Sequence, residues 1–195
     1  MRQEGLLCTK FKTRSRKYSS YKGQVGKVAP NIVKRKFKAK RPNQLWLTDV
    51  TEFRIKGQEQ RLYLSPILDV YNSEIISYTL SHHPTTKLTN KMLNKAINKS
   101  GDIKDLVIHS DQGFHYQHNS WSSKLRKLKI RQSMSRKCDC LDNSPMDNFF
   151  GILKQEMYYG VDFKNYEQLR KEIETYIKWY NEDRIKTKLN GMSPV

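Results

Sequence analysis

Segments rich in β-branched and aromatic residues follow one another after residue 44 and predict three successive strands. They cover 45–55 (LWLTDVTEFRI), 61–71 (RLYLSPILDVY) and 74–80 (EIISYTL). Turn residues near Gly57 and at Asn72-Ser73 separate them. Pro66 has no N–H to donate to a neighbouring strand, so it predicts an edge position or a bulge in the second strand.

Apolar residues recur at helical spacing further along the chain and predict four helices. Their apolar positions are Leu88, Met92, Leu93, Ala96 and Ile97; Trp121, Leu125 and Leu128; Met146, Phe149, Phe150, Leu153 and Met157; and Leu169, Ile173, Tyr176, Ile177 and Tyr180. Residues 105–110 (DLVIHS) predict a buried strand reached by a crossover, Ile130 opens a brief extended segment, and 135–145 predicts a loop. This order predicts an α/β fold in which helices cover a mixed sheet.

Charge is unevenly distributed and changes the picture of the N-terminal region. The 195 residues hold 37 Lys+Arg and 19 Asp+Glu, a net charge of +18, of which residues 1–45 carry +13 and residues 46–195 carry +5. We therefore expect a basic arm or linker over 1–43, partly disordered, ahead of a domain over 44–195. A polyanion such as a nucleic acid is the expected partner.

Basic and aromatic residues alternate within the arm. Arg14, Arg16, Lys17 and Lys22 stand among Phe11, Tyr18 and Tyr21. Such a mixture can pair with phosphates while rings stack on bases. The alternative is a solvated, disordered arm, and the two interpretations overlap.

Several classes of protein do not fit the composition. Three cysteines (Cys8, Cys138 and Cys140) cannot complete a disulfide framework, and no CxxC pair stands at zinc-site spacing from histidines. No apolar run approaches membrane-spanning length and no signal-peptide core precedes the domain. We expect reduced thiols, a cytoplasmic location and no membrane partner.

Three carboxylates stand at unusual places. Asp49 lies within an apolar strand, on the face of Leu47 and Phe53, where an unpaired carboxylate is costly. Asp111 follows the buried strand 105–110, and ligands tend to bind at the carboxyl ends of strands in α/β sheets. Asp147 lies near the start of the third helix.

Each of these acids also has a structural explanation. Asp49 can pair with a buried Arg or Lys, and Asp111 can form an Asx turn before Gly113. Ser144 and Asp147 fit a capping box, with the acid also favouring the helix dipole. For Asp147 this structural explanation is the stronger one on the residues alone.

Carboxylates that converge in one cleft repel each other unless a divalent cation lies between them. Mg²⁺ prefers oxygen ligands and keeps waters that a substrate phosphate can replace. Two such ions about 3.5–4 Å apart activate the attacking oxygen and stabilise the leaving oxygen in phosphoryl transfer. A basic protein with such a cluster is therefore consistent with a nucleic-acid-processing enzyme.

Five ordered motifs carry a resemblance to a known family. They are RPNQLWLTDVTEF (41–53), LSPILDVYNSEIISYTL (64–80), VIHSDQGFHY (107–116), SRKCDCLDNSPMDNFFGILKQE (135–156) and IKWYNEDRIKTKLNGMSPV (177–195). With them, nearly the whole chain resembles the catalytic part of OrfB-type insertion-sequence transposases, relatives of retroviral integrases with a DDE site. The resemblance implies an RNase H-like mixed five-stranded sheet flanked by helices.

The resemblance also implies site residues and a reaction. The family's three metal-binding acids fall on Asp49, Asp111 and Asp147, which would hold two Mg²⁺ (or Mn²⁺) ions for DNA cleavage and strand transfer in transposition. Its basic residue one heptad after the third acid falls on Lys154. Seven residues are nearly two helical turns, so Asp147 and Lys154 share a face, about 10.5 Å apart along the axis.

Further expectations concern partners and location. Lys154, Arg136 and Lys137 are expected to contact DNA together with the basic residues of the arm. The family implies assembly of more than one subunit on DNA element ends and target, in association with a bacterial nucleoid. The matching region lacks the helix-turn-helix segments ahead of it, which implies a truncated or degenerate copy or segments supplied by a separate chain.

The sequence departs from the family at the third acid and in the loop before it. Asp147 replaces the usual Glu, which shortens the ligand by one methylene, and Cys138-Asp139 alters the loop. Two other functions therefore stay open. One is a catalytically inactive DNA-binding remnant, which would bind DNA in a salt-dependent and sequence-tolerant way without cleavage. The other is a structural basic protein that binds RNA, a function that only the composition of the arm supports.

Overall fold

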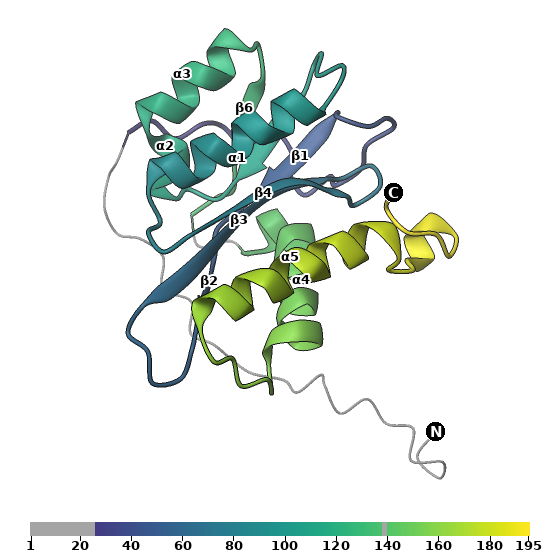
Figure 1. The fold of residues 1–195 in the computed structure, drawn as a ribbon. Coiled ribbons are helices and arrows are strands. Elements are labelled where there is room, and N and C mark those ends of the chain that lie inside the picture. Colours follow the sequence, from purple (N-terminus) through teal and green to yellow (C-terminus); the bar gives the residue numbers. More distant parts are fainter. Residues whose placement is uncertain (1–25, 138–139) are drawn as a thin grey trace.

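The computed structural model describes residues 26–137 and 140–195. The arm residues Arg14, Arg16, Lys17 and Lys22, like Cys8 and Cys138, lie outside the described residues. Figure 1 shows a twisted sheet at the centre, with α1, α2 and α3 on one side and α4 and α5 on the other. None of the helices in the described part of the chain is long and apolar enough to span a membrane.

Six strands form one mixed sheet. They are β1 (Leu45–Thr48), β2 (Thr51–Arg54), β3 (Arg61–Asp69), β4 (Ile75–Ser81), β5 (Val107–Ser110) and β6 (Arg131–Met134). Strand β3 pairs antiparallel with β1, β2 and β4, whereas β1, β5 and β6 run parallel to one another. The RNase H-like α/β architecture expected from the sequence is confirmed.

Helices connect and cover these strands. They are α1 (Thr86–Lys99), α2 (Phe114–Gln117), α3 (Asn119–Lys127), α4 (Ser144–Leu153) and α5 (Tyr166–Glu182). Single turns of other helix types lie at η1 (Cys140–Asn143), η2 (Lys154–Tyr158) and η3 (Thr187–Leu189). The turn η2 is a π-helix that continues α4, so the predicted third helix changes type at Lys154.

The sheet has six strands rather than the expected five because the first predicted strand is interrupted. Strands β1 and β2 pair with β3 in one continuous register, since Thr48 lies opposite Ile67 and Thr51 opposite Leu64. Continued across the gap, that register sets Asp49 opposite Pro66. Pro66 has no N–H to donate, and the ladder breaks at the position of this carboxylate.

Pro66 does not lie on an edge strand, so that part of the prediction was wrong. Strand β3 is paired on both sides, and β4 forms the edge beyond it. A register shift between Ile67 and Leu68 on the β4 side confirms the alternative of an irregularity in this strand. Pro66 is therefore accommodated within the sheet at an irregular part of its pairing.

Two apolar layers hold the helices to the sheet. On one face, Leu47 and Phe53 pack with Phe149 of α4 and with Ile173 of α5. On the other face, a second buried cluster joins Trp46, Ile67 and Ile108 to Met92, Leu93, Trp121 and Leu125 of α1 and α3. Alternate residues of β1 thus face opposite layers, as the pleat of a strand requires.

The segment just before the sheet packs against it. Val33 is buried in the α4–α5 layer, and Phe37 and Ala39 lie against the same cluster. The hydroxyl of Ser133 in β6 accepts hydrogen bonds from the backbone N–H groups of Ile32 and Val33 (2.9 and 3.4 Å). The described part of the expected arm, residues 26–43, is therefore attached to the domain.

Candidate active site

Asp49 lies between β1 and β2, where the ladder to β3 is interrupted. Its side chain is half-buried, and its Oδ1 accepts a hydrogen bond from the backbone N–H of Val50 (2.7 Å). Burial, and then the negative charge of Asp111, raise the pKa of Asp49 well above its usual range. The charge of Lys154 acts in the opposite direction but is a smaller effect.

Asp111 follows the last residue of β5 directly, as the sequence predicted. Its Oδ1 accepts a hydrogen bond from the backbone N–H of Gly113 (2.9 Å), so the Asx-type turn is also present. A Cβ at position 113 would lie 2.9 Å from that same oxygen, so a side chain there would displace the Asp111 carboxylate. Burial raises the pKa of Asp111.

Asp147 lies in the first turn of α4 and is exposed. The predicted capping box is wrong: the helix begins at Ser144, the N-cap position is Asn143, and no side chain caps the helix there. Partial burial of its carboxyl group, and then the charge of Asp111, raise the pKa of Asp147 to about 6. A role for Asp147 in helix capping therefore loses its main support.

The three carboxylates lie close enough to repel one another. Asp111 raises the pKa of both Asp49 and Asp147, and Asp147 in turn raises that of Asp49. These residues come from a break in a strand, the end of a parallel strand and the start of a helix. The fold thus brings together the three acids that the sequence selected.

Lys154 faces the same region from the far end of α4. Its Nζ donates to the hydroxyl of Thr51 (2.6 Å) and lies 5.3 Å from the ring centre of Phe53. Its charge lowers the pKa of Asp49. The ammonium group is therefore held beside the carboxylates by the residues that follow the strand break.

The donor atoms at this place suit a hard divalent cation. All three side chains offer carboxylate oxygens, and the raised pKa values indicate that their negative charges lack compensation. Within the described residues, however, no group of three His, Cys, Asp or Glu side chains is arranged to hold a metal ion. The residues fit the cation in chemical type, while a closed three-ligand geometry is not formed.

Asp142 is a buried carboxylate that the sequence analysis did not select. It accepts hydrogen bonds from Asn31 Nδ2 (2.8 Å), Arg35 Nε (2.9 Å) and both the backbone N–H and the guanidinium of Arg136 (2.9 Å each). The Arg136 hydrogen bonds are the largest cause of a pKa held far below the usual range. Asp142 thus anchors the loop ahead of Asp147.

His109 supports the same loop from within β5. Its side chain is fully buried; one ring nitrogen contacts the Ser133 hydroxyl (2.8 Å) and the other the backbone carbonyl of Asp142 (2.7 Å). Burial lowers the pKa of His109, so the neutral ring is favoured. The sequence His109-Ser110-Asp111 was a signal for the role of Asp111. The role of His109 could not be predicted from it, because its contacts are with residues 24 and 33 positions further along the chain.

The other basic residues selected from the sequence have different surroundings. Arg136 is ion-paired with Asp142 (2.9 Å), and Lys137 is exposed beside it. Their assignment as DNA contacts stays a prediction.

Comparison with protein families connects this site to known proteins. The description "Integrase core domain" applies to both family models that match the chain, one over residues 39–140 and the other over residues 147–195. Together these two ranges contain Asp49, Asp111 and Asp147.

Individual relatives point the same way. The chain is 44% identical over 191 residues to a protein of Escherichia coli (strain K12) named as a transposase of insertion sequence element IS150, covering 98% of this chain and 67% of that relative. It is 48% identical over 189 residues to a transposase-like protein of Haemophilus influenzae, covering 97% of this chain and 86% of that relative.

Solved structures agree on the fold. The HTLV-2 integrase catalytic core domain in complex with magnesium superposes with a TM-score of 0.65 at 19% identity, over 80% of this chain and 97% of that one. A chain of the simian T-cell lymphotropic virus intasome gives a TM-score of 0.66 at 16% identity, over 91% of this chain and 59% of that one. At these identities the likeness concerns the fold alone.

Proposed function

We propose that this chain, which belongs to the integrase core domain family, catalyses divalent-metal-dependent DNA strand cleavage and strand transfer in transposition. The observation that carries the proposal is the convergence of Asp49, Asp111 and Asp147 at the carboxyl end of β5, where burial raises all three pKa values and repulsion by the other acids further raises those of Asp49 and Asp147. Perturbed carboxylates gathered at one place are typical of functional sites.

Each acid has a distinct role in this proposal. Asp49 and Asp111 would hold one Mg²⁺ or Mn²⁺ ion, and Asp49 and Asp147 the other. When bound, the two ions would activate the attacking oxygen of water or of a DNA 3′-hydroxyl and stabilise charge on the leaving oxygen. Asp49 belongs to both pairs, which agrees with its pKa being raised by both of the other acids.

Lys154 would position a phosphate of the DNA. Its ammonium group lies beside the carboxylates, held by the Thr51 hydroxyl, and contacts to phosphates fix the register of DNA without reading its sequence. DNA element ends and target would be the partners, with more than one subunit assembled on them at the bacterial nucleoid.

A catalytically inactive DNA-binding remnant is the second candidate. Two observations favour it: Asp147 is exposed and shorter than the family's Glu, and the three acids do not form a closed ligand set among the described residues. In this case the basic surface would bind DNA and the carboxylates would not hold ions productively.

Three proteins compared on pre-cut DNA ends with Mn²⁺ separate these candidates: the wild type, Asp147→Glu and Asp147→Asn. If Asp147 works as a ligand, the wild type joins DNA and Asp147→Asn abolishes joining. If only Asp147→Glu joins DNA, the site has decayed at this position. If all three are inert while binding DNA equally, the catalytic proposal fails and the remnant is favoured.

A further inference from the structure

The surplus charge of the core domain is confined to one part of the chain. Residues 82–137 carry a net charge of +9, whereas residues 46–81 and residues 138–195 each carry −2. Residues 82–137 include α1, α2 and α3, which cover one side of the sheet in Figure 1. The net positive charge of the domain therefore lies mainly in the segment with α1, α2 and α3, rather than in the segment that carries α4 and Lys154.

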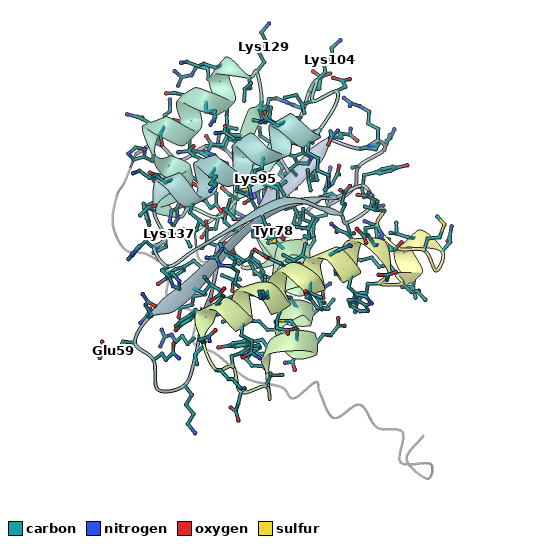
Figure 2. All side chains as sticks on the ribbon, in the orientation of Figure 1. Glu59, Tyr78, Lys95, Lys104, Lys129 and Lys137 are labelled. Carbon is teal, nitrogen blue, oxygen red and sulfur yellow. The ribbon has the colours of Figure 1, made fainter. Side chains whose placement is uncertain are left out.

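Part of this charge lines a groove at the edge of the sheet. The groove has a volume of about 490 Å³ and runs along β4 between α1 and α5. Its charged residues are Lys87, Lys91 and Lys95 from α1, with Arg170 and Glu174 from α5. Figure 2 shows Lys95 and Tyr78 in the strip between the two helices. Four basic groups thus face one acid.

The three α1 lysines form a regular row. They are spaced four residues apart, about 6 Å along the helix axis, and all three are exposed. Helix α1 contains no acidic residue. Among the contacts within the described residues, Lys87 and Lys91 form no ion pair or hydrogen bond, and Lys95 donates only to the backbone carbonyl of Tyr78 (3.4 Å). Glu174 is the one acid among the residues that line this groove, so repulsion along the row is only partly compensated within the described fold.

One end of the groove is connected to the candidate active site through His115. His83, Thr85 and Lys87 line that end. The carbonyl of the intervening residue Pro84 accepts a hydrogen bond from His115 Nε2 (2.6 Å), and the charge of Asp111 acts on the ring of His115. The row of lysines thus leads from the sheet edge towards the neighbourhood of the second acid.

We propose that the groove between α1 and α5 is a second DNA-binding surface, in which Lys87, Lys91, Lys95 and Arg170 contact the sugar-phosphate backbone of duplex DNA that leaves the active site along β4. The proposal rests on the proposed function in taking DNA as the substrate. DNA is favoured over a peptide or a second copy of the chain because four basic groups and one acid line the groove, which makes it complementary to a polyanion.

The test measures the affinity of the full chain for a labelled duplex of arbitrary sequence, without divalent cations, over about 50 to 200 mM salt. The variant is Lys87→Gln/Lys91→Gln/Lys95→Gln. The matched control is Lys104→Gln/Lys127→Gln/Lys129→Gln, three exposed lysines at another part of the same layer, of which Figure 2 labels Lys104 and Lys129. Both variants remove three positive charges.

The slope of log K against log salt falls by about 0.9 for each phosphate that the protein no longer neutralises, so the α1 variant is expected to lower it by roughly 2 to 3 while the control changes it little. Glu174→Lys, which adds charge inside the groove, is expected to strengthen binding. Equal losses of affinity in both triple variants overturn the proposal. It is also overturned if the α1 variant binds DNA normally and changes only the oligomeric mass of the protein without DNA, since the groove would then be an interface between copies of the chain.

The binding measurement does not require catalysis, so its result is independent of the strand-joining assay. An inert protein that binds DNA through the α1 row contradicts the catalytic proposal alone. If the wild type joins DNA ends but the α1 variant binds duplex DNA as tightly as the wild type, only the proposal of a second DNA-binding surface is contradicted.

Discussion

The carboxylates of Asp142 and Asp49 have surroundings of opposite effect on their ionised forms. Asp142 is fully buried yet surrounded by donors, chiefly Arg136 and Arg35, which favour its ionised form. Asp49 has one backbone donor and two other acids nearby, which disfavour its ionised form. The first arrangement stabilises the fold, whereas the second leaves negative charge for a cation to compensate.

Asp142→Asn is expected to lower the free energy of unfolding by about 1.5–3 kcal/mol at neutral pH, because the variant removes hydrogen bonds to a charged group in a buried place. The folded-state pKa of Asp142 lies below the unfolded value, so its contribution is present above pH ~4 and is lost as pH falls towards the folded-state pKa. Denaturant unfolding at neutral and acidic pH measures both effects.

The difference between wild type and Asp142→Asn should therefore shrink in acid. Asp162→Asn, at an exposed loop position, is the control and should change stability little. A loss of stability in the Asp162 variant as large as that in the Asp142 variant would contradict the role assigned to the buried ion pairs.

At the scale of elements, one side chain of α5 forms two hydrogen bonds to the backbone of the edge strand. Asn181 Oδ1 accepts from the backbone N–H of Ile75 (2.9 Å), and its Nδ2 donates to the Ile75 carbonyl (3.0 Å). Ile75 is buried and begins β4. A side-chain amide therefore substitutes for a neighbouring strand at this position, and it holds α5 in place as one wall of the basic groove.

Asn181→Ala is expected to cost about 2 kcal/mol of stability, because it leaves a buried N–H and a buried carbonyl without partners. Thermal and denaturant unfolding measure the loss. Asn98→Ala on the exposed face of α1 is the control. Equal destabilisation by both variants would contradict the role of Asn181 in holding α5 against β4.

Element prediction from the sequence succeeded where periodicity was strong. The apolar positions chosen for the last helix (Leu169, Ile173, Tyr176, Ile177 and Tyr180) are all buried in α5. The interruption of the first strand was missed because it arises from Pro66, a residue of the partner strand. Register between strands is a tertiary property, so the sequence around Asp49 held no local signal for it.

At the scale of the whole molecule, divalent cations should stabilise the fold if the three acids bind them. A cation that binds only the folded state adds about 2.7 kcal/mol at one hundred times its Kd, which raises Tm by roughly 5–10 °C for a chain of this size. Thermal unfolding with Mg²⁺, with Mn²⁺ and with EDTA measures the shift.

The shift should be much smaller in Asp49→Asn, because Asp49 belongs to both proposed ion sites. In EDTA this variant is expected to melt at a higher temperature than the wild type, since it removes a carboxylate whose ionised form the fold disfavours. Equal cation shifts in the wild type and Asp49→Asn would place the bound ions elsewhere.

The sequence by itself determined the type of elements, the family and the excess of basic charge, and it singled out three candidate acids, since periodicity, motif spacing and composition are local properties of the chain. Only the tertiary structure decided which charges meet. It placed Asp49 opposite Pro66, joined Asp142 to Arg35 across 107 residues, and set Arg170 of α5 across a groove from the lysines of α1. Burial and electrostatic coupling depend on distances in space, and those distances exist only once the sheet has brought remote segments together.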